Sequence, residues 1–171
     1  LRNGVTRRWY AGWWYRDDAF SPGEELLPPE DFPTDMTLSL PYLEYSSVED
    51  DFVERTNFNQ FERTEDVFVG ASFRARLGYS SDAWGGDEDR VFLQGTWQDT
   101  LKYTQHHYLF HRLDFEGLRN LDADETEDLL LDYNANYIYT VDDYRSYRID
   151  LRAVYSKNLN TNRQVFLGGE S

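Results

Sequence analysis

The sequence contains no cysteine, which excludes disulfides, thiolate nucleophiles and cysteine zinc sites. Basic residues are scarce: 17 Lys and Arg stand against 32 Asp and Glu, giving a formal net charge of -15 at pH 7. So acidic a chain has no general surface for phosphates, and a nucleic-acid partner is excluded. Long apolar runs are also missing, so the sequence predicts no transmembrane helix.

Aromatic residues, by contrast, make up 17% of the chain, although the mean hydropathy is only -0.76. Disordered chains are poor in aromatics, so this combination indicates a folded chain in which apolar and polar residues alternate. Such alternation is clear at residues 5–16, 67–79, 129–140 and 147–155. In the run 67–79, one parity includes Val67, Phe73 and Leu77, and the other includes Arg74 and Arg76. Successive side chains of a strand point to opposite faces, so each run predicts a two-faced strand.

Noisier alternation at residues 38–45, 91–103 and 107–118 adds further strands. The predicted fold class is therefore all-β, an antiparallel meander of about seven to eight long strands with essentially no helix. Many runs exceed the ~5–6 residues of a usual strand and reach the ~9–11 residues that a tilted strand needs to cross a bilayer. We therefore expect part of a transmembrane β-barrel.

Charged residues in the middle of the strands lie on one parity, which we expect to line the lumen. Phe73, Leu131, Ile149 and Leu151, on the other parity, are expected to face lipid. The predicted lumen face consists of Arg74, Arg76, Asp132, Arg148, Asp150 and Arg152.

Connections of two lengths separate the predicted strands. Residues 17–35, 80–89 and 119–126 form long acidic links, whereas 104–106 and 141–143 are short turns. Long loops at one end and short turns at the other are typical of outer-membrane barrels. The long segment 46–66 falls at the short-turn end, and the periodicity does not explain it.

Three stretches carry a resemblance to a known family: Leu40 to Tyr45, Val48 to Asn57 and Gln60 to Asp66. Together they resemble the bacterial surface-antigen superfamily of BamA-type outer-membrane barrels. The run Leu167, Gly168, Gly169 is similar to the opening of that family's hallmark loop motif, which continues into an Arg-Gly pair.

The resemblance implies that residues 1–171 are a single segment of a larger, sixteen-stranded barrel domain, ending inside the sixth extracellular loop. It implies a bacterial outer-membrane location and a non-enzymatic role in outer-membrane protein assembly or polypeptide export. The expected partners are membrane lipid and unfolded polypeptides. A fragment with two open sheet edges is expected to pair those edges or to oligomerise.

The segment around residues 54–66 is too charged for lipid and too aromatic for a free loop. We expect it to pack as a cap at the periplasmic end, with its arginines paired to carboxylates. Its charged residues are Glu54, Arg55, Arg63, Glu65 and Asp66, together with Glu62.

No catalytic, cofactor or metal site is predicted. His107 and His111 share a parity but stand roughly 13 Å apart on a strand, too far for one ion, and a membrane interface is the preferred interpretation. The acidic residues at 122–128 are interpreted as solvated loop, with divalent-cation binding left open.

Two soluble alternatives remain open. One is a lipocalin-like barrel that binds a small apolar ligand, which requires the apolar parity to face inward. The other is a β-sandwich that binds carbohydrate through exposed aromatics, among them Trp9, Trp13, Trp14, Trp84 and Trp97.

Overall fold

The computed structural model describes residues 4–21, 35–56, 58, 63–142 and 145–159. Its elements are β1 (Val5–Asp18), β2 (Met36–Glu49), β3 (Phe52–Thr56), β4 (Thr64–Phe68), β5 (Ser72–Ser80), the 3-10 turn η1 (Asp82–Trp84), β6 (Arg90–Thr104), β7 (His107–Asn120), β8 (Glu125–Asp142) and β9 (Arg145–Lys157). Within these ranges, no helix is long and apolar enough to cross a membrane.

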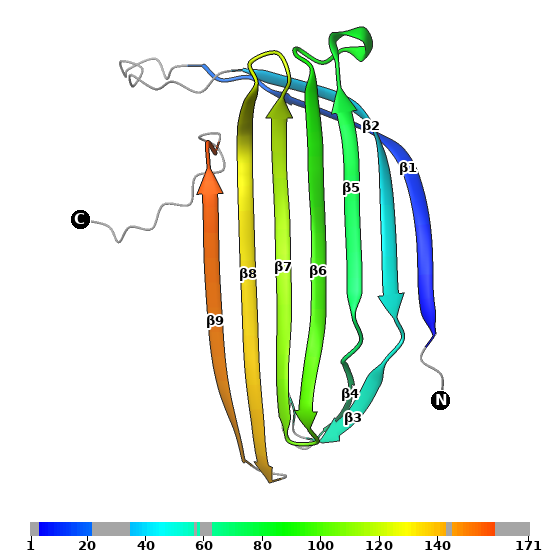
Figure 1. The fold of residues 1–171 in the computed structure, drawn as a ribbon, viewed down its shortest axis with the longest axis vertical. Coiled ribbons are helices and arrows are strands. Elements are labelled where there is room, and N and C mark those ends of the chain that lie inside the picture. The colour runs from blue at the N-terminus through cyan, green and yellow to red at the C-terminus, as the bar shows by residue number, and fades with distance from the viewer. Residues whose placement is uncertain (1–3, 22–34, 57, 59–62, 143–144, 160–171) are drawn as a thin grey trace, which may run out of the picture.

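Seven strands form one antiparallel sheet in the order β1-β2-β5-β6-β7-β8-β9, and β3 and β4 form a separate hairpin (Figure 1). The strands of the large sheet are 9 to 18 residues long. The predicted all-β meander of long strands is confirmed. In the described part of the chain the sheet is not closed, because β1 and β9 each have a single neighbour.

The connections lie as the sequence predicts. Links β1–β2, β5–β6 and β7–β8 meet at one end of the sheet, here called the loop end. The tight connections β6–β7 and β8–β9 meet at the other, the turn end (Figure 1). The unexplained segment between β2 and β5 is the β3–β4 hairpin, inserted at the turn end.

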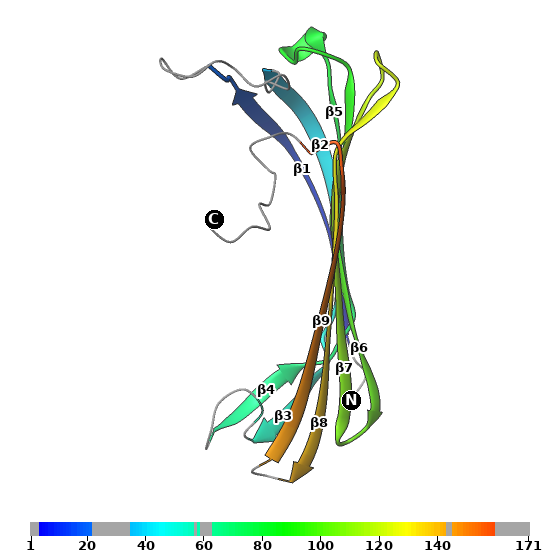
Figure 2. The same cartoon turned by 90° about the vertical axis from the view of Figure 1, so that its left-hand side faces the viewer.

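The two parities become two faces of the sheet. We call the face that the β3–β4 hairpin covers the inner face, and the opposite one the outer face. In Figure 2 the loop-end part of β1–β2 and the β3–β4 hairpin lean to the same side of the sheet. Tyr108, buried under the hairpin, and Phe92, buried under β2, both have the inner-face parity.

The run 67–79 is not one strand, which corrects the sequence prediction. The strand is interrupted between Phe68 and Ser72, where the backbone N–H groups of Val69 and Gly70 both donate to the carbonyl oxygen of Asp51. A Cβ on Gly70 would lie 2.5 Å from the carbonyl oxygen of Glu49, so only glycine fits this close approach. Val67 and Val69 consequently pack on Tyr108 at the inner face, instead of sharing the outer face with Phe73.

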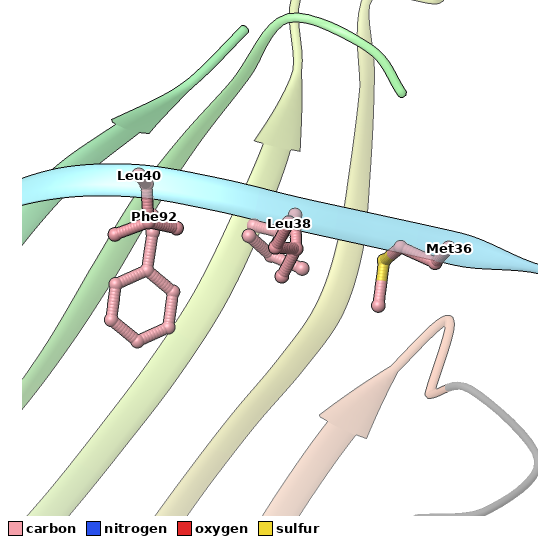
Figure 3. Close-up of a cluster of buried hydrophobic side chains, with 5 residues drawn as sticks. Met36, Leu38, Leu40 and Phe92 are labelled. Carbon is pink, nitrogen blue, oxygen red and sulfur yellow. The ribbon is translucent and has the colours of Figure 1, made fainter. Parts of the chain in front are cut away.

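A hydrophobic cluster covers the loop end of the inner face. Figure 3 shows β2 running across the strands of the sheet, with Leu40 next to Phe92 and with Leu38 and Met36 further along β2; all four belong to one buried cluster. Leu118 completes the buried set, and Trp14 packs on Phe92 with ring centroids 4.9 Å apart. The first half of β2 therefore closes over the inner face with an apolar cluster that the sequence analysis does not predict.

Glycine in the neighbouring strand makes room for this cluster. A Cβ on Gly78 would lie 2.4 Å from Cδ1 of Leu40, a contact that real side chains do not make. Gly78 faces Tyr42 in the register of β2 with β5, where β2 begins to run across the sheet. The absence of a side chain at Gly78 thus allows Leu40 of β2 to pack closely against the backbone of β5.

Candidate functional site

The middle of the inner face carries a belt of ion pairs that crosses the sheet from β2 to β9. Glu44 on β2 is buried and accepts two hydrogen bonds from Arg76 on β5, 3.1 Å from Nε and 2.8 Å from Nη2. Nε of Arg74 lies 3.6 Å from the other Glu44 oxygen, and the Arg76 guanidinium stacks 4.5 Å from the centroid of the Tyr42 ring. One buried carboxylate thus serves two guanidiniums.

The belt continues through β7, β8 and β9. Asp114 accepts from Nε of Arg112 at 2.6 Å and from the Thr96 hydroxyl at 2.7 Å. Asp132 accepts from Nη2 of Arg152 at 2.6 Å and from the Asn134 amide at 3.0 Å. A cavity of about 380 Å³ opens onto these groups. Each of the carboxylates Glu44, Asp114 and Asp132 thus has an arginine partner, and charged groups away from bulk water are tolerated when they are paired in this way.

All six predicted lumen residues share the inner face. Following the register, Arg74 lies level with Asp132, and Arg76 lies two residues nearer the loop end. Arg152, Asp150 and Arg148 follow one another at two-residue intervals along β9, where Asp150 accepts from the Asn136 amide. The structure brings Arg152 and Asp132 into direct contact, whereas Arg74 and Arg76 pair with Glu44.

The predicted polar segment forms the β3–β4 hairpin, with Glu54 opposite Asp66, Arg55 opposite Glu65, and Arg63 just before β4. Arg55 reaches across to the β6–β7 turn, donating to the carbonyl of Gln105 at 2.9 Å and to the Tyr108 hydroxyl. These partners are neutral, where carboxylates were expected. Beneath them, Val53, Phe58, Val67 and Val69 pack on Tyr108 and Phe110, holding the hairpin on the inner face. The predicted motif Leu167, Gly168, Gly169, like Glu62, lies outside the described residues.

The outer face is apolar and exposed. Its large side chains include Trp9, Trp13, Tyr15, Leu43, Phe73, Leu77, Leu93, Trp97, Tyr147, Ile149, Leu151 and Tyr155, each at least 37% exposed. Soluble monomers rarely expose so continuous an apolar surface, and such surfaces are typical of contact sites for a protein partner, a ligand or a membrane.

This apolar surface forms a band that crosses the strands obliquely. The register connects Trp9 on β1 to Tyr155 on β9 through Tyr45, Ala75, Gly95, Phe115 and Leu131. The loop-end boundary of the band is the first charged residue on the outer face of each strand. On β1 it is Asp17, eight residues past Trp9, and on β9 it is Lys157, two residues past Tyr155. The boundary therefore moves six residues over six strand-to-strand steps, about one residue per strand.

At about 3.3 Å per residue and about 4.8 Å between strands, this slope is about 35°. The boundary at the turn end slopes the same way, because Arg7 lies two residues past Trp9 on β1 and Asp99 four residues past Gly95 on β6. A flat apolar layer that meets strands at this angle matches the tilt of strands in membrane barrels.

Both predicted strand histidines lie on the outer face and bond tyrosines of β8. Nδ1 of His107 is 2.6 Å from the Tyr137 hydroxyl, and Nδ1 of His111 is 2.9 Å from the Tyr133 hydroxyl. The His107 ring also stacks on Tyr139, with centroids 4.4 Å apart. In the described ranges no group of three or more His, Asp or Glu side chains is arranged to hold a metal ion.

The acidic loop-end residues surround one buried cation. Arg90 is 5% exposed and pairs with Asp87, Glu88 and Glu127, the last at 2.8 Å. Burial lowers the pKa of Arg90, but the bonds to Glu127 and Asp87 outweigh burial, so the pKa is raised. Arg90 and its carboxylates lie beyond the loop-end boundary of the apolar band. Arg119, which has the outer-face parity and lies one register row closer to the band, is already charged and pairs with Asp124.

The other acids of this predicted cluster also have protein partners. Asp122 accepts from the backbone nitrogen of Asp89 at 3.1 Å, and Glu125 accepts from the Asn158 amide at 3.2 Å. The first contact ties the connections β5–β6 and β7–β8 together, and the second ties the start of β8 to the residue that follows β9. Both give the acidic residues a structural role at the loop end.

Sequence reasoning missed several members of the belt. Glu44, Arg112 and Asp114 hold its central contacts, and the alternation of Arg112, Asp114 and Glu116 along β7 was a signal available to find them. The pairing of Glu44 with Arg76 has no local signal, because the β3–β4 hairpin separates their strands. No protein-family model, curated protein or solved structure matches this chain.

Proposed function

We propose that this sheet is part of the wall of a transmembrane β-barrel in a bacterial outer membrane, without enzymatic activity. The observation that carries the proposal is the oblique apolar band on the outer face, opposite a self-compensated belt of ion pairs. A charge at the lipid-facing midplane costs roughly 2–4 kcal/mol, so the belt belongs on the lumen side and the band against lipid.

The lipocalin-like alternative requires the apolar parity to line an enclosed cavity. In this structure the apolar parity forms the outer face, which neither the β3–β4 hairpin nor the first half of β2 covers. Its large side chains are exposed. The geometry therefore supports the membrane wall better than the soluble barrel.

Spin labels at adjacent positions of β9 test the orientation of the two faces. In lipid vesicles, a label at Ile149 should be accessible to lipid-soluble oxygen, and one at Asp150 to a water-soluble nickel chelate. The reversed pattern would contradict the membrane proposal and favour the soluble barrel.

The proposed role in outer-membrane protein assembly or polypeptide export is supported by the resemblance of residues 40–66 to surface-antigen barrels. A photo-crosslinking residue at Asn134, on the inner face, should capture unfolded polypeptide in cells, and one at Tyr133, on the outer face, should not. Capture at neither position would remove the export role and leave the barrel proposal standing.

A further inference from the structure

A second cavity opens on the inner face near the turn end, between the ion-pair belt and the β3–β4 hairpin. It measures about 480 Å³, within the usual range for small-molecule sites. Two neighbouring register rows across β6–β9 line it, together with Phe68 from β4. One row is Gln98, Arg112, Asn134 and Arg152, and the other is Thr100, Phe110, Asn136 and Asp150.

The lining is rich in groups that both donate and accept hydrogen bonds. Gln98, Asn134 and Asn136 carry amides and Thr100 a hydroxyl. Among the described residues, the Gln98 side chain has no hydrogen-bond partner and is free to bind a ligand. The charged members of the two rows are already engaged: Arg112 with Asp114, Arg152 with Asp132, and Asp150 with the Asn136 amide. A ligand that fits is therefore polar and uncharged.

Peptides and sugars are both polar and uncharged, and the contacts that the cavity offers distinguish between them. Of the four strands of the large sheet that line the cavity, β6, β7 and β8 are paired on both sides, and only β9 has a free edge for strand addition by a peptide. Across the rest of the lining, recognition rests on side chains, with the Phe68 and Phe110 rings beside the amides. Hydroxyl groups donate and accept as amides do, and sugar rings also present an apolar face to aromatic side chains.

We propose that this cavity binds a neutral oligosaccharide. The inference goes beyond the proposed membrane function, because it rests on the inner face alone. It is tested by binding in detergent solution, a measurement in which contact with lipid plays no part. Failure of binding therefore leaves the membrane proposal intact, and failure of the spin-label test leaves this one intact.

Isothermal titration of the whole protein with three neutral sugars, maltohexaose, cellohexaose and fully N-acetylated chitohexaose, tests the proposal. At least one of them should bind saturably with a Kd below about 1 mM. Gln98→Leu keeps the size of the side chain but removes its amide, and should weaken binding at least about 5-fold, the value of one net hydrogen bond.

Gln94→Leu is the matched control. Gln94 is also on β6 at the inner face, but it donates to Glu116 at 2.7 Å and does not line this cavity. Its substitution should leave the Kd unchanged. Asn136→Asp, which conserves shape, provides a second variant and should also weaken binding, and circular dichroism reports whether each variant folds.

Three results would overturn the proposal. The first is no saturable binding of any of the three sugars to the folded wild-type protein. The second is tighter binding of an acetylated octapeptide of alternating Ala and Ser, which would make the site a polypeptide track. The third is equal weakening by Gln98→Leu and Gln94→Leu.

Discussion

Arg76 holds Glu44 across the β2–β5 junction with two hydrogen bonds to one carboxylate oxygen, 3.1 Å from Nε and 2.8 Å from Nη2. This pair joins the two strands between which the chain leaves the sheet to build the β3–β4 hairpin. The ion pair therefore stabilises the pairing of β2 with β5, two strands that no short turn connects. Substituting Arg76 and its neighbour Arg74 in turn measures how much the ion pair contributes to stability.

Arg76→Gln should lower the free energy of unfolding by about 2 kcal/mol, because it leaves the buried Glu44 carboxylate without its main donor. Arg74→Gln should cost less than about 1 kcal/mol, since Arg74 is 67% exposed at the side chain and lies 3.6 Å from Glu44. Urea unfolding of the two variants, followed by tryptophan fluorescence, measures the difference. Equal losses would contradict the assignment of Arg76 as the main partner.

Arg55→Met should loosen the β3–β4 hairpin, since it removes the donors to Gln105 and Tyr108. A local loss of one to two kcal/mol raises the open population about 5- to 30-fold, and trypsin cleavage after Arg63 should accelerate accordingly. Tyr108→Phe should give a smaller acceleration, because it removes one acceptor and keeps the packed ring.

Glu54→Gln provides the control for the hairpin, because Glu54 is adjacent to Arg55 but exposed. Its cleavage rate should match that of the wild-type protein. Equal rates for the Arg55 and Glu54 variants would show that apolar packing alone holds the hairpin in place.

Two adjacent tryptophans should report opposite environments. Trp13 is on the outer face and 56% exposed, whereas Trp14 packs on Phe92 at the inner face. In vesicles of brominated lipid, the fluorescence of a variant retaining only Trp13 should be strongly quenched, and that of a variant retaining only Trp14 much less. Equal quenching would contradict the outward orientation of the apolar band.

Gly78→Ala should destabilise the sheet by about 1–3 kcal/mol, because the added methyl group collides with Leu40 and overpacks the loop-end cluster. At Gly117 the nearest side-chain atom to an added Cβ is Cδ1 of Leu129, at 3.3 Å, which can rotate away. Gly117→Ala should therefore be nearly neutral. Thermal unfolding of both variants compares them, and a similar loss at both sites would argue against tight packing at Leu40.

Periodicity in the sequence is enough to predict the strands of the large sheet and the two faces of most of them. Strand periodicity is a local property: once Ile149 points outward, Asp150 must point inward, whatever the rest of the chain does. The same reasoning fails at Gly70, where a close approach to Glu49 breaks the run 67–79 and turns Val67 and Val69 onto the inner face.

The covering of the inner face and the pairing of its charges depend on contacts between segments that are distant in sequence. Met36, Leu38 and Leu40 reach Phe92 and Leu118 because β2 runs across the sheet, and no local pattern encodes that contact. The partner of Arg76 likewise depended on β2 pairing with β5 past an inserted hairpin. Alternation fixes which side a residue faces, but packing between segments distant in sequence fixes what it meets there.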